Sequence, residues 1–133
     1  MANPNHSNKA SRDKLSIMVD AKHILQTLQE AWPNIPKFER ADGAPAIMRR
    51  ACYDLIAHLT VGLECPEVRL EHIYLMLAAY SRILTSFELC QHLLSDRHKL
   101  EVAERLERIQ EGAARWRSAS RSMKGHVHEE FTD

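Results

Sequence analysis

The sequence has few of the residues that break a chain or cross-link it. Its 133 residues include four glycines, five prolines and three cysteines, and aromatic residues make up only 6%. An odd number of cysteines without a Cys-x-x-Cys pair argues against a disulfide scaffold and predicts free buried thiols in a reducing cytoplasm. No apolar run reaches the roughly 20 residues that cross a bilayer, and the polar start lacks an apolar leader. We therefore expect a cytoplasmic protein without a membrane partner.

Charge is abundant but balanced. Lysine plus arginine and aspartate plus glutamate number 18 each, and the pI is near 7.1. This balance excludes a uniformly basic coat for nucleic acid but leaves room for a local basic patch. The 44% of hydrophobic and 27% of charged residues exclude disordered, collagen-like and membrane classes and fit one modest domain.

Four segments carry apolar residues at steps of three, four and seven, the spacing of a single buried helix face. We predict helices from Arg12 to Ala31, from about Ala44 to Leu63, over 68–94, and from Ser95 or Asp96 to about 120–125. Pro33 and Pro36 end the first helix because proline lacks an N–H and restricts the residue before it. The predicted core positions are Ile17, Ala21, Ile24, Leu28 and Ala31; Ile47, Ala51, Leu55, Ile56, Leu59 and Leu63; Ile73, Leu77, Tyr80, Leu84 and Phe87; and Val102, Leu106, Ile109, Ala113 and Trp116.

Short connections between these helices favour antiparallel neighbours. The sequence therefore predicts an all-α, antiparallel up-down four-helix bundle over residues 12–124. We expect a flexible N-terminal tail over residues 1–11 and an acidic C-terminal tail over residues 125–133.

The last predicted helix carries a local excess of positive charge. Residues 97–125 include eight basic and four acidic side chains, and the spacing places Arg105, Arg108 and Arg115 along one line opposite the core face. Arginine suits phosphate because its guanidinium is planar, permanently charged and forked. The alternative interpretation is a solvated face decorated by pairs such as Glu101–Arg105 and Glu104–Arg108 at i,i+4.

Enzyme motifs are missing from the sequence. It has no glycine-rich phosphate loop, no His-Glu-x-x-His and no nucleophile elbow, and it lacks the two Glu-x-x-His turns of a carboxylate-bridged di-metal bundle. The pairs Asp20/His23, Asp54/His58 and Glu88/His92 are more typical of surface hydrogen bonds than of a metal site. We therefore expect no catalytic residues, no metal and no cofactor. Trp32 and Trp116 are assigned to packing because each lies on a core-facing row.

The start of the second helix carries a more specific pattern. Pro36-Lys37-Phe38-Glu39-Arg40, followed by Ile47-Met48-Arg49-Arg50-Ala51, resembles the small four-helix proteins encoded in ribosomal-RNA intervening sequences. Within that family the chain is most similar to the Avd branch, the accessory variability determinants of diversity-generating retroelements. The similarity rests on the long third helix with Leu75-Met76-Leu77 and Arg82, the polar turn before the fourth helix, and a late tryptophan followed by basic residues and glycine.

The resemblance implies a non-catalytic accessory protein. Avd-like proteins form a homopentameric barrel, bind the retroelement's reverse transcriptase, and engage template RNA, and with it cDNA, during mutagenic reverse transcription. In a ring-like homo-oligomer the same basic stripe would be repeated on every subunit. The resulting positive electrostatic potential would attract phosphates without sequence preference. The candidate nucleic-acid and partner-binding residues are Lys37, Arg40, Arg49, Arg50, Arg105, Arg108, Arg115, Arg117, Arg121 and Lys124.

Two other functions fit the same sequence. The neutral pI favours a stand-alone bundle that acts as a protein-interaction scaffold without nucleic acid. A metal-dependent bundle enzyme is the remote third alternative, because the required ligand set is incomplete.

Overall fold

The computed structural model describes the main chain of residues 4–132 and the side chains of residues 15–116 and 118. Four long helices account for most of it: α1 (Pro4–Ala31), α3 (Ala44–Glu64), α4 (Arg69–Cys90) and α5 (Asp96–Thr132). A short helix, α2 (Lys37–Asp42), and three 3₁₀ turns, η1 (Trp32–Asn34), η2 (Pro66–Val68) and η3 (Gln91–Leu93), connect them. No strand occurs within the described main chain. The predicted all-α class and four-helix bundle are confirmed.

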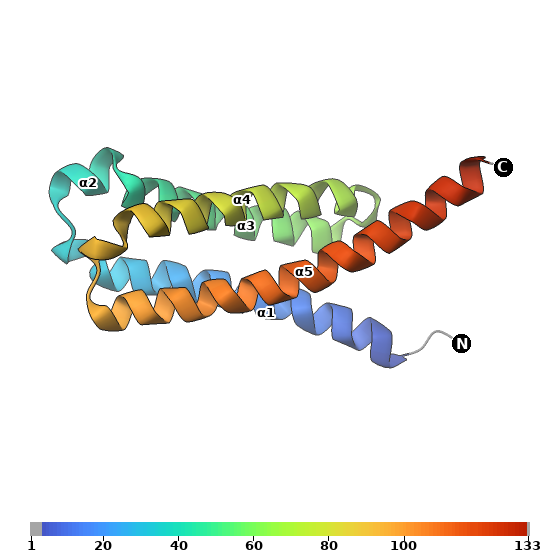
Figure 1. The fold of residues 1–133 in the computed structure, drawn as a ribbon, viewed down its shortest axis with the longest axis horizontal. Helices are drawn as coiled ribbons and strands as arrows, with labels where there is room; N and C mark the ends of the chain where they lie inside the picture. The colour runs from blue at the N-terminus through green and yellow to red at the C-terminus, as the bar shows by residue number, and fades with distance from the viewer. Residues whose placement is uncertain (1–3, 133) are drawn as a thin grey trace.

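The long helices form two antiparallel pairs that pack on each other (Figure 1). α3 packs most extensively on α4, and α1 packs on α5 and, less extensively, on α3. α4 and α5 touch over a much shorter length. Figure 1 shows the last turns of α5 and the first turns of α1 extending beyond the other helices at the same end of the bundle.

The core follows the predicted rows on α1 and α5. Ile17, Ala21, Ile24, Leu28 and Ala31 are all buried, as are Val102, Leu106, Ile109, Ala113 and Trp116. These residues meet buried side chains of α3 and α4 in one continuous cluster. Each of the two helices therefore buries a single apolar stripe, as its period of about 3.6 residues requires.

The buried faces of α3 and α4 agree with the prediction in part: the predicted core positions Ala51, Leu55, Leu59, Ile73, Tyr80 and Phe87 are buried, and others are not. Ile47 was expected in the core but is 46% exposed, whereas Met48 and Cys52 are fully buried. On α4, Leu77 and Leu84 are only half-buried, while Ala79 and Ile83 lie in the core. One residue changes the direction of a helical side chain by about 100°, and these two helices are apolar on several sides. Their partner, and not their own pattern, selects the face that is buried.

Both ends of the chain differ from the predicted boundaries. α1 begins at Pro4, inside the segment expected to be a tail, and α5 runs through Gly125 to Thr132. Proline is well suited to the first turn of a helix, and no further proline follows until Pro33. A single internal glycine costs only about 1 kcal/mol relative to alanine, so Gly125 does not have to end α5.

The connections follow local chemistry. Pro45 lies in the first turn of α3, as predicted. The backbone N–H of His98 donates to Ser95 Oγ at 3.2 Å, so Ser95 is the N-cap of α5. α2 was not predicted, because six residues between Pro36 and Gly43 are too few to show a helical period.

One described segment, Pro66–Leu93, is long and apolar enough to cross a membrane by length and composition. It contains α4, and 44% of its most apolar stretch is buried inside the bundle. A helix in the core of a bundle passes the same test.

Candidate nucleic-acid interface

A buried carboxylate on α1 engages two of the arginines on α5. Asp20 is 1% exposed, and its Oδ1 accepts a hydrogen bond from Arg105 Nη1 at 2.8 Å. Arg108 Nε lies 3.6 Å from the same oxygen. The other oxygen, Asp20 Oδ2, is buried and has no hydrogen-bond partner among the described residues. The two guanidiniums therefore balance a charge that the fold has placed between α1 and α5.

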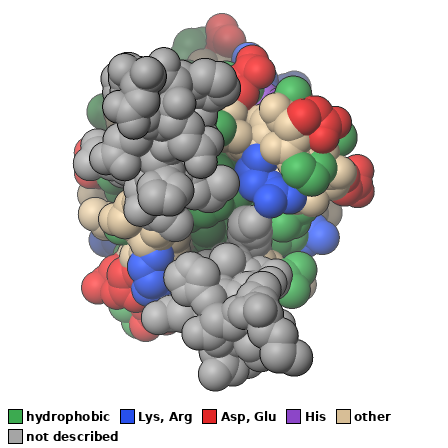
Figure 2. All heavy atoms as spheres, turned by 90° about the vertical axis from the view of Figure 1, so that its right-hand side faces the viewer, with side chains coloured by type: hydrophobic (Ala, Val, Ile, Leu, Met, Phe, Trp, Pro, Cys, Tyr) green, Lys and Arg blue, Asp and Glu red, His purple; other side chains and the backbone are tan. Residues whose placement is uncertain are grey.

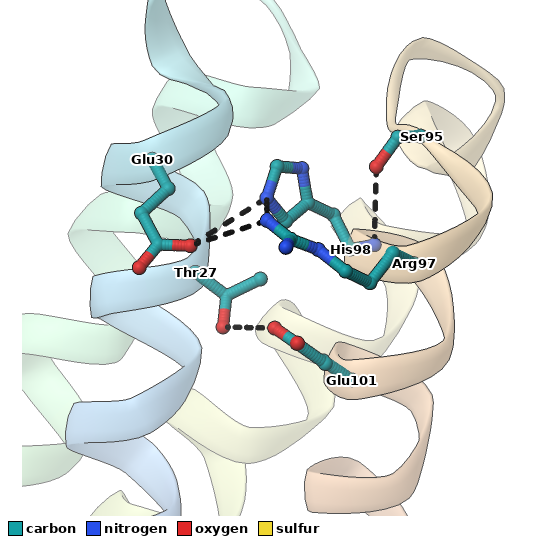
Figure 3. Close-up of polar contacts among 6 residues, drawn as sticks. All are labelled: Thr27, Glu30, Ser95, Arg97, His98 and Glu101. Atoms are coloured by element: carbon teal, nitrogen blue, oxygen red, sulfur yellow. Dashed lines mark hydrogen bonds and ion pairs between the residues drawn. The ribbon is translucent and has the colours of Figure 1, made fainter.

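Further polar contacts continue this seam toward the start of α5 (Figure 3). Glu30 on α1 faces Arg97 at 3.9 Å and His98 at 3.6 Å. One turn earlier, Thr27 donates its hydroxyl to Glu101 at 3.3 Å. Figure 3 shows these side chains pointing toward one another across the gap between the two helices. Polar pairs thus line the same interface that the apolar rows fill.

The predicted outward stripe on α5 is wrong at Arg105. Its side chain is 25% exposed and faces α1, whereas the prediction placed it opposite the core. Arg108 is 58% exposed and shares the Asp20 carboxylate, and Arg115 is exposed and makes an interaction of its own. Glu101, which the alternative interpretation pairs with Arg105 along the helix, accepts a hydrogen bond from Thr27 on α1. Much of this positive charge therefore serves the contact between α1 and α5.

Three further candidates, Arg117, Arg121 and Lys124, lie on the main chain of α5 but outside the residues whose side chains the structure describes. Their assignment as nucleic-acid contacts stays a prediction.

The basic residues of α2 and α3 are differently placed. Lys37, Arg49 and Arg50 are exposed, and no ion pair among the described residues engages any of them. Arg40 is half-buried, with a buried Nε that has no hydrogen-bond partner in the described part of the chain. Phe38, beside Lys37, is 82% exposed and has the largest exposed fraction of the described large hydrophobic side chains. Three cations and an aromatic ring on α2 and the first turns of α3 are thus exposed to solvent. We call these four residues, Lys37, Phe38, Arg49 and Arg50, the α2–α3 face, because the two helices that carry them contact each other.

Next to this face, α1 and α3 enclose a hollow of about 240 Å³. Its walls include two aromatic rings, Trp32 and Tyr53, and the guanidinium carbon of Arg49 lies 4.9 Å from the centre of the Trp32 ring. Tyr53 is 55% exposed. The sequence assigned Trp32 to packing, and Trp32 does pack against the core cluster, half-buried and with Arg49 over its ring.

A second, longer hollow follows the poorly packed seam between α4 and α5. Two adjoining cavities of about 560 and 210 Å³ share Tyr80 and Gln110 as lining residues. Leu77 and Leu84 line these cavities on one side and pack against the core cluster on the other, which explains why both are only half-buried. Along this seam the single chain leaves apolar surface uncovered.

Members of two of the side-chain pairs considered as metal ligands, Asp20/His23 and Asp54/His58, are engaged by other residues. Asp20 is bound to Arg105, and Asp54 forms an ion pair with Arg82 at 3.2 Å. His58 contacts His72 of α4, with their Nδ1 atoms 3.3 Å apart. Among the described residues, no three His, Cys, Asp or Glu side chains are grouped closely enough to hold a metal ion.

The end of the bundle where both termini lie carries side chains of both signs on the part drawn in colour (Figure 2). Basic side chains there are interspersed with acidic and hydrophobic ones. Charge on this visible part is mixed, in keeping with the neutral composition.

The chain matches no known family profile, no curated protein and no solved structure. The resemblance to Avd-like proteins therefore stays a prediction from the residues quoted above.

Two features of the site were missed by sequence reasoning. Asp20 lies between Ile17 and Ile24 at steps of three and four, so its position on the buried face was readable from the spacing alone. An acid on that face needs a cation from a neighbouring helix, and the arginines of α5 supply it. Nothing in the spacing distinguishes Trp32 as a pocket wall from Trp32 as core.

Proposed function

We propose that this protein is a non-catalytic accessory factor of a diversity-generating retroelement. It binds the reverse transcriptase and the template RNA or cDNA, and so supports mutagenic reverse transcription. The proposal joins the resemblance of residues 36–51 to Avd-like proteins with the four-helix bundle seen here. The observation that carries it is the α2–α3 face, where exposed cations have no acidic partner among the described residues.

The phosphate-binding surface is placed on α2 and α3 and not on the middle of α5. Arg105 and Arg108 already balance Asp20, so a phosphate would have to compete with a carboxylate at 2.8 Å. Lys37, Arg49 and Arg50 have no such competitor among the described residues. Contacts of this kind act on the sugar-phosphate backbone and carry little sequence preference.

The reverse transcriptase contact is assigned to the same face. An exposed aromatic ring flanked by cations can bury apolar area while the charges orient the partner, and Phe38 beside Lys37 has this arrangement. Replacing Phe38 with serine is expected to reduce co-purification with the reverse transcriptase while leaving the thermal unfolding midpoint unchanged. A variant that binds the polymerase as well as the native chain would remove Phe38 from the interface.

Assembly into a ring-like homo-oligomer, a pentamer by resemblance, fits the uncovered seam between α4 and α5. Ala78 lines this seam and is exposed, so Ala78→Glu introduces a charge there without removing a core side chain. Ala57→Glu, at an exposed position on α3, is the matched control. Light scattering after size-exclusion chromatography should show a smaller species for Ala78→Glu only. Equal masses for both variants would exclude this seam as the interface.

Charge reversal tests nucleic-acid binding by the α2–α3 face. The double variant Lys37→Glu/Arg50→Glu should weaken the retardation of structured RNA at low salt by at least tenfold. Lys22→Glu, an exposed lysine of α1, serves as the charge-change control and should have little effect. Lys22→Glu makes one such charge reversal and the double variant makes two, so a logarithmic loss of affinity for Lys22→Glu about half that of the double variant would indicate that only net charge matters. An unaffected double variant would refute the assignment.

A protein-interaction scaffold without nucleic acid is the second candidate. The salt-bridged seam between α1 and α5 and the mixed charges of Figure 2 favour it. Two observations distinguish the candidates. The accessory factor requires that the native protein retard RNA in a gel at micromolar concentration and low salt, whereas the scaffold does not. The accessory factor also requires a reverse-transcriptase gene, with paired template and variable repeats, beside this gene.

A further inference from the structure

The hollow between α1 and α3 combines three kinds of side chain that together suit one kind of ligand. Its floor is apolar, from Leu25 and Leu28 of α1. Its aromatic walls are Trp32, at the end of α1, and Tyr53, on α3. At its rim are the Gln29 amide and the Arg49 guanidinium. The aromatic and polar groups come from two helices and a turn, so the fold and not local sequence brings them together.

The size of the hollow limits what can enter. At about 240 Å³ it is smaller than the roughly 300–1,000 Å³ of pockets that hold drug-sized ligands. One planar ring system fits this space better than a folded chain or a large cofactor. Its mouth is open to solvent, because Tyr53 is 55% exposed and Gln29 and Arg49 are exposed as well.

The charge and hydrogen-bonding groups select among planar ligands. Among the described residues that line the hollow, the one ionic group is a cation, and a guanidinium favours phosphate because it can donate two parallel hydrogen bonds. Gln29 offers both a donor and an acceptor, which match the edge of a nucleobase. Arg49 is already held with its guanidinium 4.9 Å from the Trp32 ring centre, which leaves its position partly fixed before any ligand binds.

We infer that this hollow is a base-stacking site for one unpaired nucleotide of a single-stranded nucleic acid. The base stacks against Tyr53 and the Trp32–Arg49 pair, and the adjoining phosphate binds Arg49. This inference rests on the proposed function and adds to it, because the α2–α3 face alone requires phosphates and no base. Stacking on aromatic side chains tolerates any base, so the site needs no sequence preference.

The test compares two strands on the same protein. One is a fluorescently labelled strand of uridines, and the other has the same length and sugar-phosphate backbone but lacks its bases. Both are titrated with the full-length chain at low salt and followed by fluorescence anisotropy. The native chain should bind the uridine strand about 5- to 150-fold more tightly than the abasic strand, the range expected for stacking of one base.

Variants at Tyr53 make the comparison specific to the hollow. Tyr53→Ala should weaken binding of the uridine strand by about the same 5- to 150-fold and leave binding of the abasic strand unchanged. Tyr53→Phe keeps the ring and should bind the uridine strand like the native chain. Circular dichroism and light scattering on Tyr53→Ala establish that the fold and the oligomeric state are native.

Each outcome separates this inference from the function on which it rests. Equal binding of the two strands by the native chain would overturn the base site but leave phosphate binding by the α2–α3 face intact. Failure of the native chain to bind either strand would overturn both. If base dependence is present, a deoxyuridine strand tested in parallel identifies the ligand: tighter binding of the ribose strand supports the template RNA, and equal or tighter binding of the deoxyribose strand supports the cDNA.

Discussion

Replacing Arg105 with glutamine is expected to destabilise the bundle more than replacing its partner Asp20 with asparagine. Asp20 is 1% exposed, so its charge is held out of water and depends on Arg105 at 2.8 Å. Removing one partner of a buried ion pair typically costs about 3–5 kcal/mol, because the remaining charge is left uncompensated. Arg108 stays within 3.6 Å and covers part of that loss, so we expect about 2–3 kcal/mol for Arg105→Gln.

Replacing Asp20 with asparagine leaves two cations without their carboxylate. Arg105 and Arg108 side chains are 25% and 58% exposed, so both cations reach water when Asp20 becomes neutral. Asparagine keeps a side-chain oxygen that can accept from Arg105. It also removes the buried charge of the Asp20 carboxylate, whose Oδ2 has no hydrogen-bond partner among the described residues. A loss of about 1 kcal/mol is therefore expected for Asp20→Asn, the order of one hydrogen bond. Arg108→Gln should cost about 0–1 kcal/mol because it is exposed.

Urea unfolding followed by circular dichroism, at one fixed protein concentration, measures the native chain, the three single variants and the double variant Asp20→Asn/Arg105→Gln. The double variant should be more stable than Arg105→Gln alone, because the uncompensated charge is gone. If Asp20→Asn costs as much as Arg105→Gln, or if the double variant is the sum of the singles, the carboxylate is not the buried charge that this reasoning requires.

Burial raises the pKa of Cys52 to about 12, and burial together with the charge of Glu39 raises the pKa of Cys90 to about 11. A thiol reagent at pH 8 should therefore modify only the half-buried Cys65 in the native chain, and all three thiols in urea. Labelling of two or more thiols in the native chain would contradict this burial. The folded-state pKa values of these two thiols lie above the unfolded value of 9.0. The stability that they contribute to the folded state is therefore fully present below about pH 9 and is lost as pH rises toward 11–12, by about 1.4 kcal/mol for each unit between the folded and unfolded pKa values. A urea midpoint that does not fall over this range, or that falls equally in Cys52→Ala, would refute the assignment. A Cβ at Gly43 would lie 2.9 Å from the Glu39 carbonyl oxygen. Gly43→Ala should therefore displace α2, lower the free energy of unfolding by about 1–3 kcal/mol and reduce the affinity for RNA. Unchanged urea unfolding would show that the turn accommodates the added methyl group without cost.

The sequence predicts the bundle well where one helix has one apolar side. α1 and α5 each carry a single stripe, and every residue of those two stripes is buried as expected. It predicts less where helices are apolar on several sides, as at Ile47 and Leu77, because the choice of buried face then depends on the partner. The uncovered seam between α4 and α5 is a property of packing and has no counterpart in the spacing.

In the candidate site, too, local features were predicted from the sequence and contacts between helices were not. Local sequence identified the cations of α2 and α3, and the structure leaves Lys37, Arg49 and Arg50 exposed. It placed Arg105 outward because a charge run on one helix contains no information about an acid 85 residues away on another. The meeting of Trp32, Arg49 and Tyr53 likewise depends on how α1 crosses α3.

The salt dependence of RNA binding measures how many phosphates the α2–α3 face neutralises. If the α2–α3 face binds phosphates, the logarithm of affinity falls linearly with the logarithm of salt concentration, with a slope of about −0.7 for each phosphate neutralised on a single strand. Lys37→Glu/Arg50→Glu should then reduce the steepness of that slope by about 1.4, two such contacts, whereas Lys22→Glu should leave it unchanged. An affinity insensitive to salt, or the same slope in all three proteins, would contradict the account.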